Sequence, residues 1–380
     1  MAVRWAEAKR RGACGSGRTM ERGIVHAGGN AQVRARSTGA GPRRRVSDVL
    51  GSQCNDFFHF CNEFSPIAAL PPIIANLKIL AATSARRVLA LCALALLLAA
   101  ARAPGDAHRR TASWGPRWLA LFAARLLTAS AHAIGVEHDV AWPPGAIDPH
   151  QQCVVVWHPH GALTFSALFF GALLSIRRQP VRWRTAVASL LFRVPLLREV
   201  LLLVGAREVT PGVMRALLAA GHSVGVQPGG IPEQLRTSQT REHAFFPPNL
   251  TFVRLAIEHG TPLLPVYLFG ENQLFSTRPA LQRLARAVHA RFGLPAIIPL
   301  GRWGLPWPVP RRARVHIRFG RPVPVGPACA RPSEEVVNEV FARYTAELRR
   351  LFDEHKALLP AGVAARGLTI VRRVRPAGRL

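Results

Sequence analysis

The sequence predicts an α/β fold, in which helices flank a mostly parallel sheet and an apolar helical hairpin precedes it. From about residue 140 onward, short β-branched or aliphatic runs alternate with longer segments whose apolar residues recur at helical spacing. The runs that predict strands are residues 153–157, 185–189, 223–227, 263–269 and 314–319. The segments that predict helices are residues 162–175, 196–203, 212–220, 252–259 and 333–358. This alternation is typical of parallel strands joined by crossover helices.

The first of these strands ends at a proline and a glycine. Residues 153–157 are apolar and mostly β-branched, which favours a buried strand. Pro159 cannot donate a hydrogen bond to a neighbouring strand, and Gly161 permits a sharp turn. The almost entirely apolar segment 162–175 then predicts a helix that is buried on most faces. His158 and His160 are therefore expected at a corner between a strand and a helix.

Two further strands end in unusual polar corners. Residues 223–227 run into Pro228, Gly229 and Gly230, and residues 263–269 run into Gly270, Glu271 and Asn272. Between them, residues 252–259 predict an amphipathic helix that ends at Gly260. Residues 314–319 alternate apolar and polar side chains, which predicts an edge strand or a late strand.

The last long helix has the clearest signals. Ser333 is a good N-cap residue, and Glu334 and Glu335 place negative charge in the first turn. The apolar stripe that follows has helical spacing. Its members are Val337, Phe341, Tyr344, Leu348 and Phe352.

Composition limits the classes of partner. The chain has 380 residues, 49% of them hydrophobic, and its formal net charge is +29. This charge suits an anionic membrane surface or an acidic substrate. A nucleic-acid partner is disfavoured, because no known nucleic-acid-binding motif occurs and only 2 Tyr are present for base stacking. The 6 Cys form no Cys-x-x-Cys pair, so the sequence predicts neither a zinc knuckle nor a disulfide scaffold.

The amino-terminal part differs from the rest. Residues 1–66 are basic, poor in acidic residues and without apolar periodicity, which predicts a disordered leader. Two apolar runs, residues 88–101 and 118–134, are joined by a polar turn and predict a membrane-associated hairpin, which either enters one leaflet or forms a short pair of transmembrane helices. The alternative is that both runs are core helices of a globular domain. The expected segments are 1–66 for the leader, 67–138 for the hairpin, 139–360 for the α/β domain and 361–380 for a basic tail.

The three polar corners predict a functional site. In open α/β sheets, ligands bind at the carboxyl ends of the strands, so the corners are expected to meet. A neutral imidazole is well suited to take a proton near neutral pH, which makes His160 the first candidate base and His158 the second. Glu271 is the third candidate catalytic residue. The candidate substrate-binding residues are Pro159, Gly161, Pro228, Gly229, Gly230, Glu233, Arg254 and Asn272.

Each of these features also has a structural alternative. The two histidines would then only close a turn, Pro228 to Gly230 would be an ordinary turn, and Glu271 and Arg254 would be solvated surface charges. Arg254 could also meet a phosphate or pair with Glu271. A His-x-His pair can chelate a metal, but His150, His222 and His243 stand at no known ligand spacing. We therefore expect no metal.

The chain resembles the type-two diacylglycerol acyltransferase family, which includes monoacylglycerol and wax-alcohol acyltransferases. Six stretches between about residues 150 and 358 occur in the family's order and spacing. They are VVVWHPHGALTF, FRVPLLREVLLLVGAREV, VGVQPGGIPEQL, FVRLAIEHGTPLLPVYLFGENQLF, WGLPWPVPRRARVHIRFGRPVPV and YTAELRRLFDEHKALL. The resemblance implies a fold like that of the glycerolipid acyltransferases, with residues 139–360 as the catalytic domain and the hairpin as a membrane anchor.

The same resemblance implies acyl transfer from acyl-CoA to the hydroxyl of a neutral lipid, diacylglycerol in the first instance. The implied location is the endoplasmic reticulum membrane or the lipid-droplet surface, with acyl-CoA as a co-substrate, no cofactor, and self-association as a further expectation. The acceptor could instead be monoacylglycerol, a lysolipid or a wax alcohol. Alternatives of other classes are a membrane lipid-binding homologue without turnover and a metal-dependent hydrolase.

Two departures from related patterns bear on the site. Glycerol-phosphate acyltransferases carry an Asp five residues after the base, where this chain has Phe165 after His160 and Leu163 after His158. An orienting carboxylate is therefore expected from Glu271 or Glu233. The family's Arg-Lys-Gly before Phe-Val-Lys/Arg is replaced by residues 249–251, Asn-Leu-Thr, which removes one expected phosphate contact.

Overall fold

A computed structural model describes residues 105–143, 151–172, 183–293, 296–306 and 309–373. The predicted leader at 1–66 and the first apolar run at 88–101 lie outside these residues, as does the part of the predicted helix 162–175 beyond residue 172. The predicted boundaries at 66 and 138 stay predictions.

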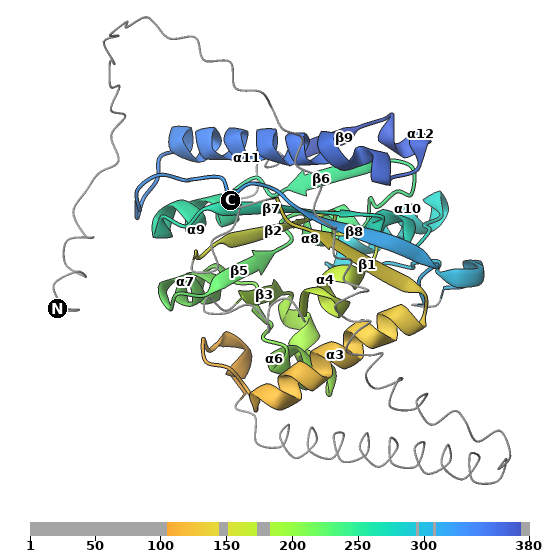
Figure 1. Cartoon of the computed structure of the whole chain (residues 1–380), viewed down its shortest axis with the longest axis horizontal. Helices are drawn as coiled ribbons and strands as arrows, with labels where there is room; N and C mark the ends of the chain where they lie inside the picture. Colours follow the sequence, from red (N-terminus) through yellow and green to blue (C-terminus); the bar gives the residue numbers. More distant parts are fainter. Residues whose placement is uncertain (1–104, 144–150, 173–182, 294–295, 307–308, 374–380) are drawn as a thin grey trace, which may run out of the picture. The chain divides into compact units, whose positions relative to one another are not determined.

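A seven-stranded sheet forms the centre of the described structure (Figure 1). Its order is β1 (Val136–Ala141), β8 (Ala313–Phe319), β7 (Leu263–Phe269), β2 (Val154–His158), β5 (Ser223–Val226), β3 (Trp183–Val187) and β4 (Arg207–Glu208). All neighbours run parallel except β7 and β8, which are antiparallel. The prediction of a mostly parallel sheet is therefore confirmed.

Of the two alternatives for residues 314–319, the late strand is confirmed and the edge strand is wrong. β8 comes late in the chain, but it lies between β1 and β7 and is paired on both sides. The outer strand is β1, whose sequence Val-Glu-His-Asp-Val-Ala carries too many polar side chains to stand out as a strand. Its polar residues are tolerated because an edge strand is only partly covered.

Helices cover both faces of the sheet. They are α3 (Arg117–Ala133), α4 (Phe165–Phe169), α6 (Leu197–Leu203), α7 (Pro211–Ala219), α8 (Gly230–Gln234), α9 (Thr251–His259), α10 (Pro279–Phe292), α11 (Glu334–His355) and α12 (Ala361–Ala364). Short 3₁₀ turns are η2 (Ala107–Arg109), η3 (Ser189–Arg193), η4 (Glu271–Gln273), η5 (Arg302–Gly304) and η6 (Lys356–Leu358). In Figure 1, α9 and α11 lie on one side of the sheet, and α3 and α6 lie on the other. The helix predicted from residue 162 begins later, at Phe165.

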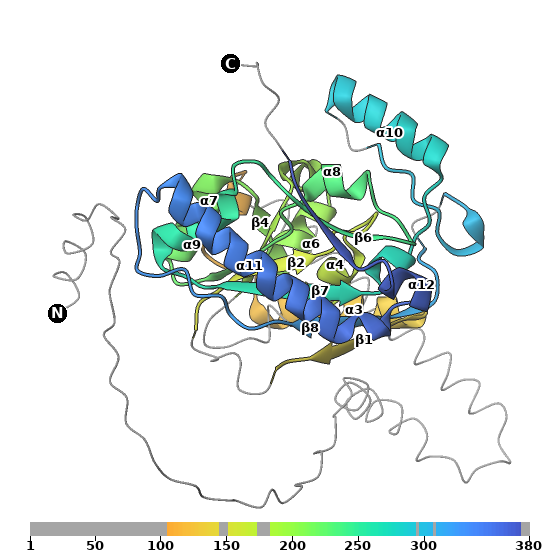
Figure 2. The ribbon, with the colours of Figure 1, turned by 90° about the horizontal axis from the view of Figure 1, so that it is seen from above.

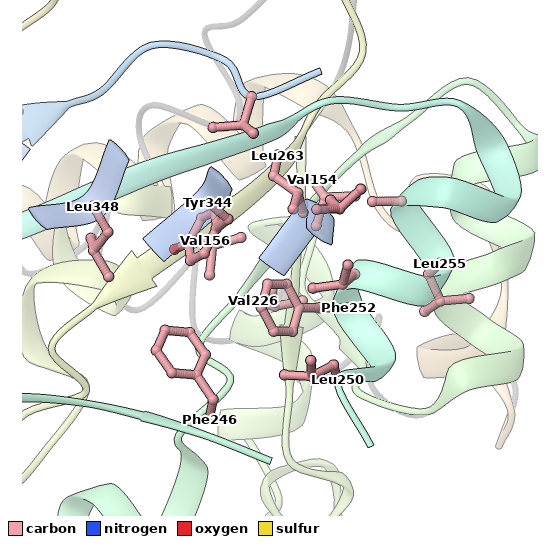
Figure 3. Close-up of a cluster of buried hydrophobic side chains, with 14 of the residues drawn as sticks. Val154, Val156, Val226, Phe246, Leu250, Phe252, Leu255, Leu263, Tyr344 and Leu348 are labelled. Carbon is pink, nitrogen blue, oxygen red and sulfur yellow. The ribbon is translucent and has the colours of Figure 1, made fainter. Parts of the chain in front are cut away.

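The larger hydrophobic core lies between the sheet and the helices α7, α9 and α11 (Figure 3). Val154 and Val156 of β2 point into it, and Tyr344 and Leu348 of α11 cover them. The predicted N-cap of α11 is confirmed, because the Ser333 hydroxyl accepts a hydrogen bond from the Val336 amide at 3.4 Å. The apolar stripe on this helix is what fastens it to the sheet.

The second apolar run of the predicted hairpin forms α3. One face of this helix is buried and contacts α4, α6 and β1, while Trp118 on the other face is exposed. Among the described helices, none combines the length and the hydropathy that a membrane span requires.

A small second sheet joins the end of the chain to the middle. Strand β6 (Glu242–Phe246) pairs in parallel with β9 (Leu368–Arg372). Both strands are absent from the sequence-based expectations, and β9 lies in the segment that was expected to be a tail. This pairing holds Glu242 beneath the site described next.

Candidate active site

The carboxyl ends of β2, β5 and β7 place the three predicted corners at one edge of the sheet. β2 lies between β5 and β7, with His158 opposite Tyr267 of β7. The corners also touch one another. The backbone amide of His160 donates to Glu233 Oε1 at 3.0 Å, and a Cβ on Gly161 would lie 3.0 Å from Cγ of Glu271. The structure therefore brings together most of the residues that the sequence suggested.

His160 is half-buried at this edge. Its Nδ1 forms a hydrogen bond with the Thr164 hydroxyl at 3.0 Å, and within the described part of the chain this is the ring's one recorded hydrogen bond. When Nδ1–H is the donor, Nε2 carries an available lone pair. Burial lowers the pKa of His160 to about 4, so the ring is neutral at physiological pH. A neutral, open imidazole nitrogen is what a general base requires.

His158 is fully buried, in contrast to His160. Its Nε2 forms a hydrogen bond with the Tyr344 hydroxyl at 2.9 Å, and its ring packs edge-on against Phe246. Burial and the nearby positive charge of a protonated His160 lower its pKa to about 3. The ring thus faces the core beneath α11, while its role as a second base stays a prediction.

The alternative of a metal site would require a group of ligating side chains. In the parts of the chain that the structure describes, no three His, Cys, Asp or Glu side chains are grouped to hold a metal ion. His150 lies outside those parts, and His222 and His243 are only half-buried.

Glu271 is a buried carboxylate that fixes the start of α4. Its Oε1 accepts a hydrogen bond from the Phe165 amide at 2.9 Å, and its Oε2 accepts one from the Ser166 hydroxyl at 2.5 Å. The Ser166 amide is 3.3 Å from both oxygens, and the Ser166 hydroxyl also meets His138 Nε2 at 3.1 Å. Burial raises the pKa of Glu271 to about 7, although these donors oppose the shift. Glu271 therefore shapes the loop that carries His160.

Glu233 supports the same loop from the second corner. Its side chain is buried and accepts a hydrogen bond from the backbone amide of His160. Burial raises the pKa of Glu233 to about 8. Gly229 is required beside it, since a Cβ there would lie 1.7 Å from Glu233 Oε2. Gly230 has φ +52° as the chain enters α8, a conformation that favours glycine. Pro228 precedes them at the end of β5.

The described structure shows no direct hydrogen bond from Glu271 or Glu233 to the His160 ring, and their role in orienting it stays a prediction. Both carboxylates hold backbone amides near the ring, and the ring's own partner is the Thr164 hydroxyl. Thr164 was not predicted, because the related pattern has an acid five residues after the base, whereas Thr164 carries a hydroxyl and stands four residues after it.

Arg254 also differs from one expectation. Its guanidinium pairs with Glu334 at the start of α11 and donates to the Asn249 carbonyl at 3.0 Å. It does not pair with Glu271, because it projects from α9 toward α11. Its contact with a substrate stays a prediction.

Glu242 is a further residue at the site that the sequence did not indicate. This buried carboxylate of β6 accepts hydrogen bonds from Tyr267 at 2.8 Å, from the Asn272 amide group at 2.7 Å and from Gln273 at 3.2 Å. Burial raises its pKa. It thereby positions Asn272 at the third corner. Residues 236–243, RTSQTREH, have the composition of an exposed loop, so nothing in the sequence marks Glu242 as buried.

A small basic pocket adjoins these corners. Pro159, Glu233 and Asn272 line one side of it. The other lining residues are Arg236, Thr237, Ser238, Arg241, His243 and Phe245. The Arg236 guanidinium lies 5.8 Å from the centre of the Phe245 ring, and Arg241 is exposed. Two guanidinium groups at the rim suit a phosphate-bearing substrate.

Comparison with known proteins assigns the chain to a family. The family model for diacylglycerol acyltransferase matches residues 144–364, which cover every strand of the main sheet except β1, the three corners and α11. The chain belongs to the diacylglycerol acyltransferase family and is an O-acyltransferase.

Individual relatives differ in their named acceptors. The chain is 30% identical over 230 residues to 2-acylglycerol O-acyltransferase 1 of Bos taurus, covering 55% of this chain and 67% of that protein. It is 28% identical over 224 residues to human acyl-CoA wax alcohol acyltransferase 1, covering 55% and 68%. It is 25% identical over 226 residues to diacylglycerol O-acyltransferase 2 of Dictyostelium discoideum, covering 55% and 67%.

One solved structure shows a weaker likeness. The crystal structure of the 1-acyl-sn-glycerophosphate acyltransferase from Thermotoga maritima is 15% identical, covers 63% of this chain and 82% of that chain, and gives a TM-score of 0.38. A TM-score at this level supports no conclusion about mechanism or substrate.

Proposed function

We propose that this enzyme transfers a fatty acyl chain from acyl-CoA to the hydroxyl of diacylglycerol, forming triacylglycerol. The observation that supports the proposal most directly is His160, a neutral half-buried histidine with Nε2 open, held at the meeting point of three strand ends. Acyl-CoA serves as a co-substrate, and the proposed reaction needs no other cofactor. The alternative acceptors are monoacylglycerol and a long-chain alcohol, which the names of two relatives favour.

In the proposed mechanism His160 transfers one proton twice. Its Nε2 takes the proton of the acceptor hydroxyl while that oxygen attacks the thioester carbonyl carbon, and a tetrahedral adduct forms. The carbon–sulfur bond then breaks, and the imidazolium returns the proton to the leaving thiolate. The products are an ester and free CoA, and the ring is neutral again. The low pKa of His160 favours the second transfer, since the imidazolium gives up its proton readily.

The buried carboxylates have a supporting role in this scheme. Glu233 and Glu271 hold the backbone on either side of His160, so the ring does not drift from the position in which it meets the hydroxyl. We place the enzyme at the endoplasmic reticulum membrane or the lipid-droplet surface, because the proposed acceptor and product are neutral lipids.

The acceptor is tested with membranes that contain the full-length chain. They are supplied with labelled acyl-CoA and, separately, with diacylglycerol, monoacylglycerol or a long-chain alcohol, and the labelled lipids are separated. We expect labelled triacylglycerol to dominate. A dominant wax ester would identify a long-chain alcohol as the acceptor, and dominant labelled diacylglycerol would identify monoacylglycerol. No product above membranes without the chain would contradict the proposed activity.

The basic pocket predicts how acyl-CoA is bound. Changing Arg236 and Arg241 to glutamine should raise the KM for acyl-CoA about tenfold per lost charge-assisted hydrogen bond, with little change in kcat. Arg215→Gln is the matched control, because Arg215 pairs with Glu258 on the surface of α7 and α9. Kinetics with acyl-CoA and its 3′-dephospho analogue measure the effect. An unchanged KM in the double variant would show that the pocket does not bind CoA.

A further inference from the structure

Helix α10 is an amphipathic helix that the described structure leaves largely uncovered. Its apolar residues recur every three or four positions, at Leu281, Leu284, Ala285, Val288 and Phe292, and Ala285 is its buried residue. The side chains of Leu284 and Phe292 are 57% and 65% exposed. Figure 2 shows α10 standing away from the sheet, at one side of the other helices. An apolar stripe in that position indicates an interaction surface for a partner outside the described fold.

The loop that follows α10 also carries exposed apolar side chains. Ser276, just before α10, pairs with Leu300 of this loop at 2.8 Å, so the two segments run side by side at their base. Beyond Leu300, Trp303 is 75% exposed and Leu305 is 55% exposed. We call the exposed apolar residues Leu284, Phe292, Ile298, Trp303 and Leu305 the α10 face. All five residues belong to α10 and the loop that follows it.

The segment that carries the α10 face has arginines and no acidic residues. Residues 272–333 contain no Asp or Glu. The arginines of α10 and its flanking loop are Arg278, Arg283, Arg286, Arg291, Arg302, Arg311 and Arg312. In the described part of the chain, none of them forms an ion pair with a carboxylate. Arg291 and Arg302 each lie 5.6 Å from the ring centre of the neighbouring Phe292 or Trp303.

We propose that the α10 face lies on an anionic lipid surface. An amphipathic helix with arginines beside exposed leucine and aromatic side chains is suited to the boundary between headgroups and acyl chains. Tryptophan is favoured at that boundary, and arginines are attracted to the anionic lipids of a leaflet. A second copy of the chain fits this face poorly, because it would bring the same arginines together with no acidic residue in the segment to pair with them.

The α10 face is also tied to the candidate active site. The Gln282 side chain of α10 donates to the Thr237 carbonyl at 2.7 Å, and Thr237 lines the basic pocket. At the same amino-terminal end, the segment that leads into α10 follows η4, which carries Glu271 and Asn272. If the proposed function holds, the helix therefore keeps the site next to the membrane from which a lipid acceptor would arrive. The lipid contact itself does not depend on that function.

The test uses the full-length chain reconstituted into vesicles. Emission from Trp303 is taken as the difference between the unaltered protein and Trp303→Phe. We expect phosphatidylcholine with brominated acyl chains to quench this emission, and aqueous iodide to leave it largely unquenched when phosphatidylserine is present. The triple variant Arg283→Gln, Arg286→Gln and Arg291→Gln should restore iodide quenching. Arg343→Gln on the exposed side of α11 is the matched control and should not.

Two results would overturn the proposal. The first is Trp303 emission that iodide quenches equally with and without vesicles. The second is protection from iodide that depends on protein concentration and not on lipid, which would assign the face to a second copy. Acyl transfer is measured on the same samples, so loss of activity and loss of lipid contact are seen separately. Leu284→Asp with Phe292→Asp should lower activity on vesicle-borne acceptor at least about tenfold and spare a water-soluble short-chain acceptor.

Discussion

His160→Ala is expected to lower the rate of acyl transfer by about 10²- to 10⁴-fold, the usual contribution of a positioned general base. The loss should appear in kcat, since the ring is proposed to act on the hydroxyl proton and not to hold the substrate. The fold should survive, because His160 is only half-buried and its ring bonds to a single hydroxyl, that of Thr164. Membrane association should be unchanged.

The matched control for this variant is His132→Ala. His132 is an exposed histidine in the last turn of α3, and its loss should leave the rate within about twofold of the unaltered enzyme. Initial rates with labelled acyl-CoA measure both variants, at equal amounts of folded protein. An active His160→Ala enzyme would assign the proton transfer to another group.

Glu271→Ala is expected to destabilise the protein by about 3 kcal/mol or more and to abolish activity with it. The carboxylate accepts hydrogen bonds from the Phe165 amide and from the amide and hydroxyl of Ser166, and removing it leaves these buried donors unpaired. The start of α4 and the loop from His160 would then lose their attachment to the third corner. Thermal unfolding in detergent measures the change in stability.

Ser166→Ala provides a graded comparison for that experiment. It removes the hydroxyl donor and leaves both amide donors in place, so it should cost about 1 kcal/mol and preserve most activity. If Glu271→Ala is no less stable than Ser166→Ala, the carboxylate does not hold the loop as described.

Acidity should affect stability through His158, which is buried, and His138, which is half-buried. The folded-state pKa of His158 is about 3 and that of His138 about 4, each below the ordinary 6.5. Above about 6.5 both are neutral in the folded and unfolded chain, so they add no pH dependence. As the pH falls below that value, the unfolded chain binds protons that the folded chain does not, and each histidine costs about 1.4 kcal/mol per pH unit. Glu233 and Glu271 act in the opposite direction, because burial raises their folded-state pKa values to about 8 and about 7.

The sheet and the position of the site were largely predictable from the sequence. Buried strands such as Leu263–Phe269 are marked by uninterrupted apolar runs, and their ends are marked by glycine and proline. Because parallel strands end at one edge, the corners at His160, Glu233 and Glu271 could be expected to meet. No long-range contact had to be known for that inference.

The details that the sequence could not supply depend on contacts between distant segments. Glu242 lies on a strand that pairs with β9, over a hundred residues later in the chain. β1 is a strand because β8 accepts it at the edge of the sheet, in spite of its polar residues. The use of Glu233 and Glu271 to hold backbone amides, with Thr164 bonded to the ring, follows from loop geometry that composition does not record.

The central claim is that Nε2 of His160 accepts the proton of the attacking hydroxyl, and added imidazole tests it most directly. In His160→Ala, the account predicts that imidazole restores part of the acyl-transfer rate in proportion to its concentration, because a free ring can enter the space that the side chain left. The same addition should not help Glu271→Ala. Absence of any rescue in a folded His160→Ala enzyme that still binds acyl-CoA would contradict the claim.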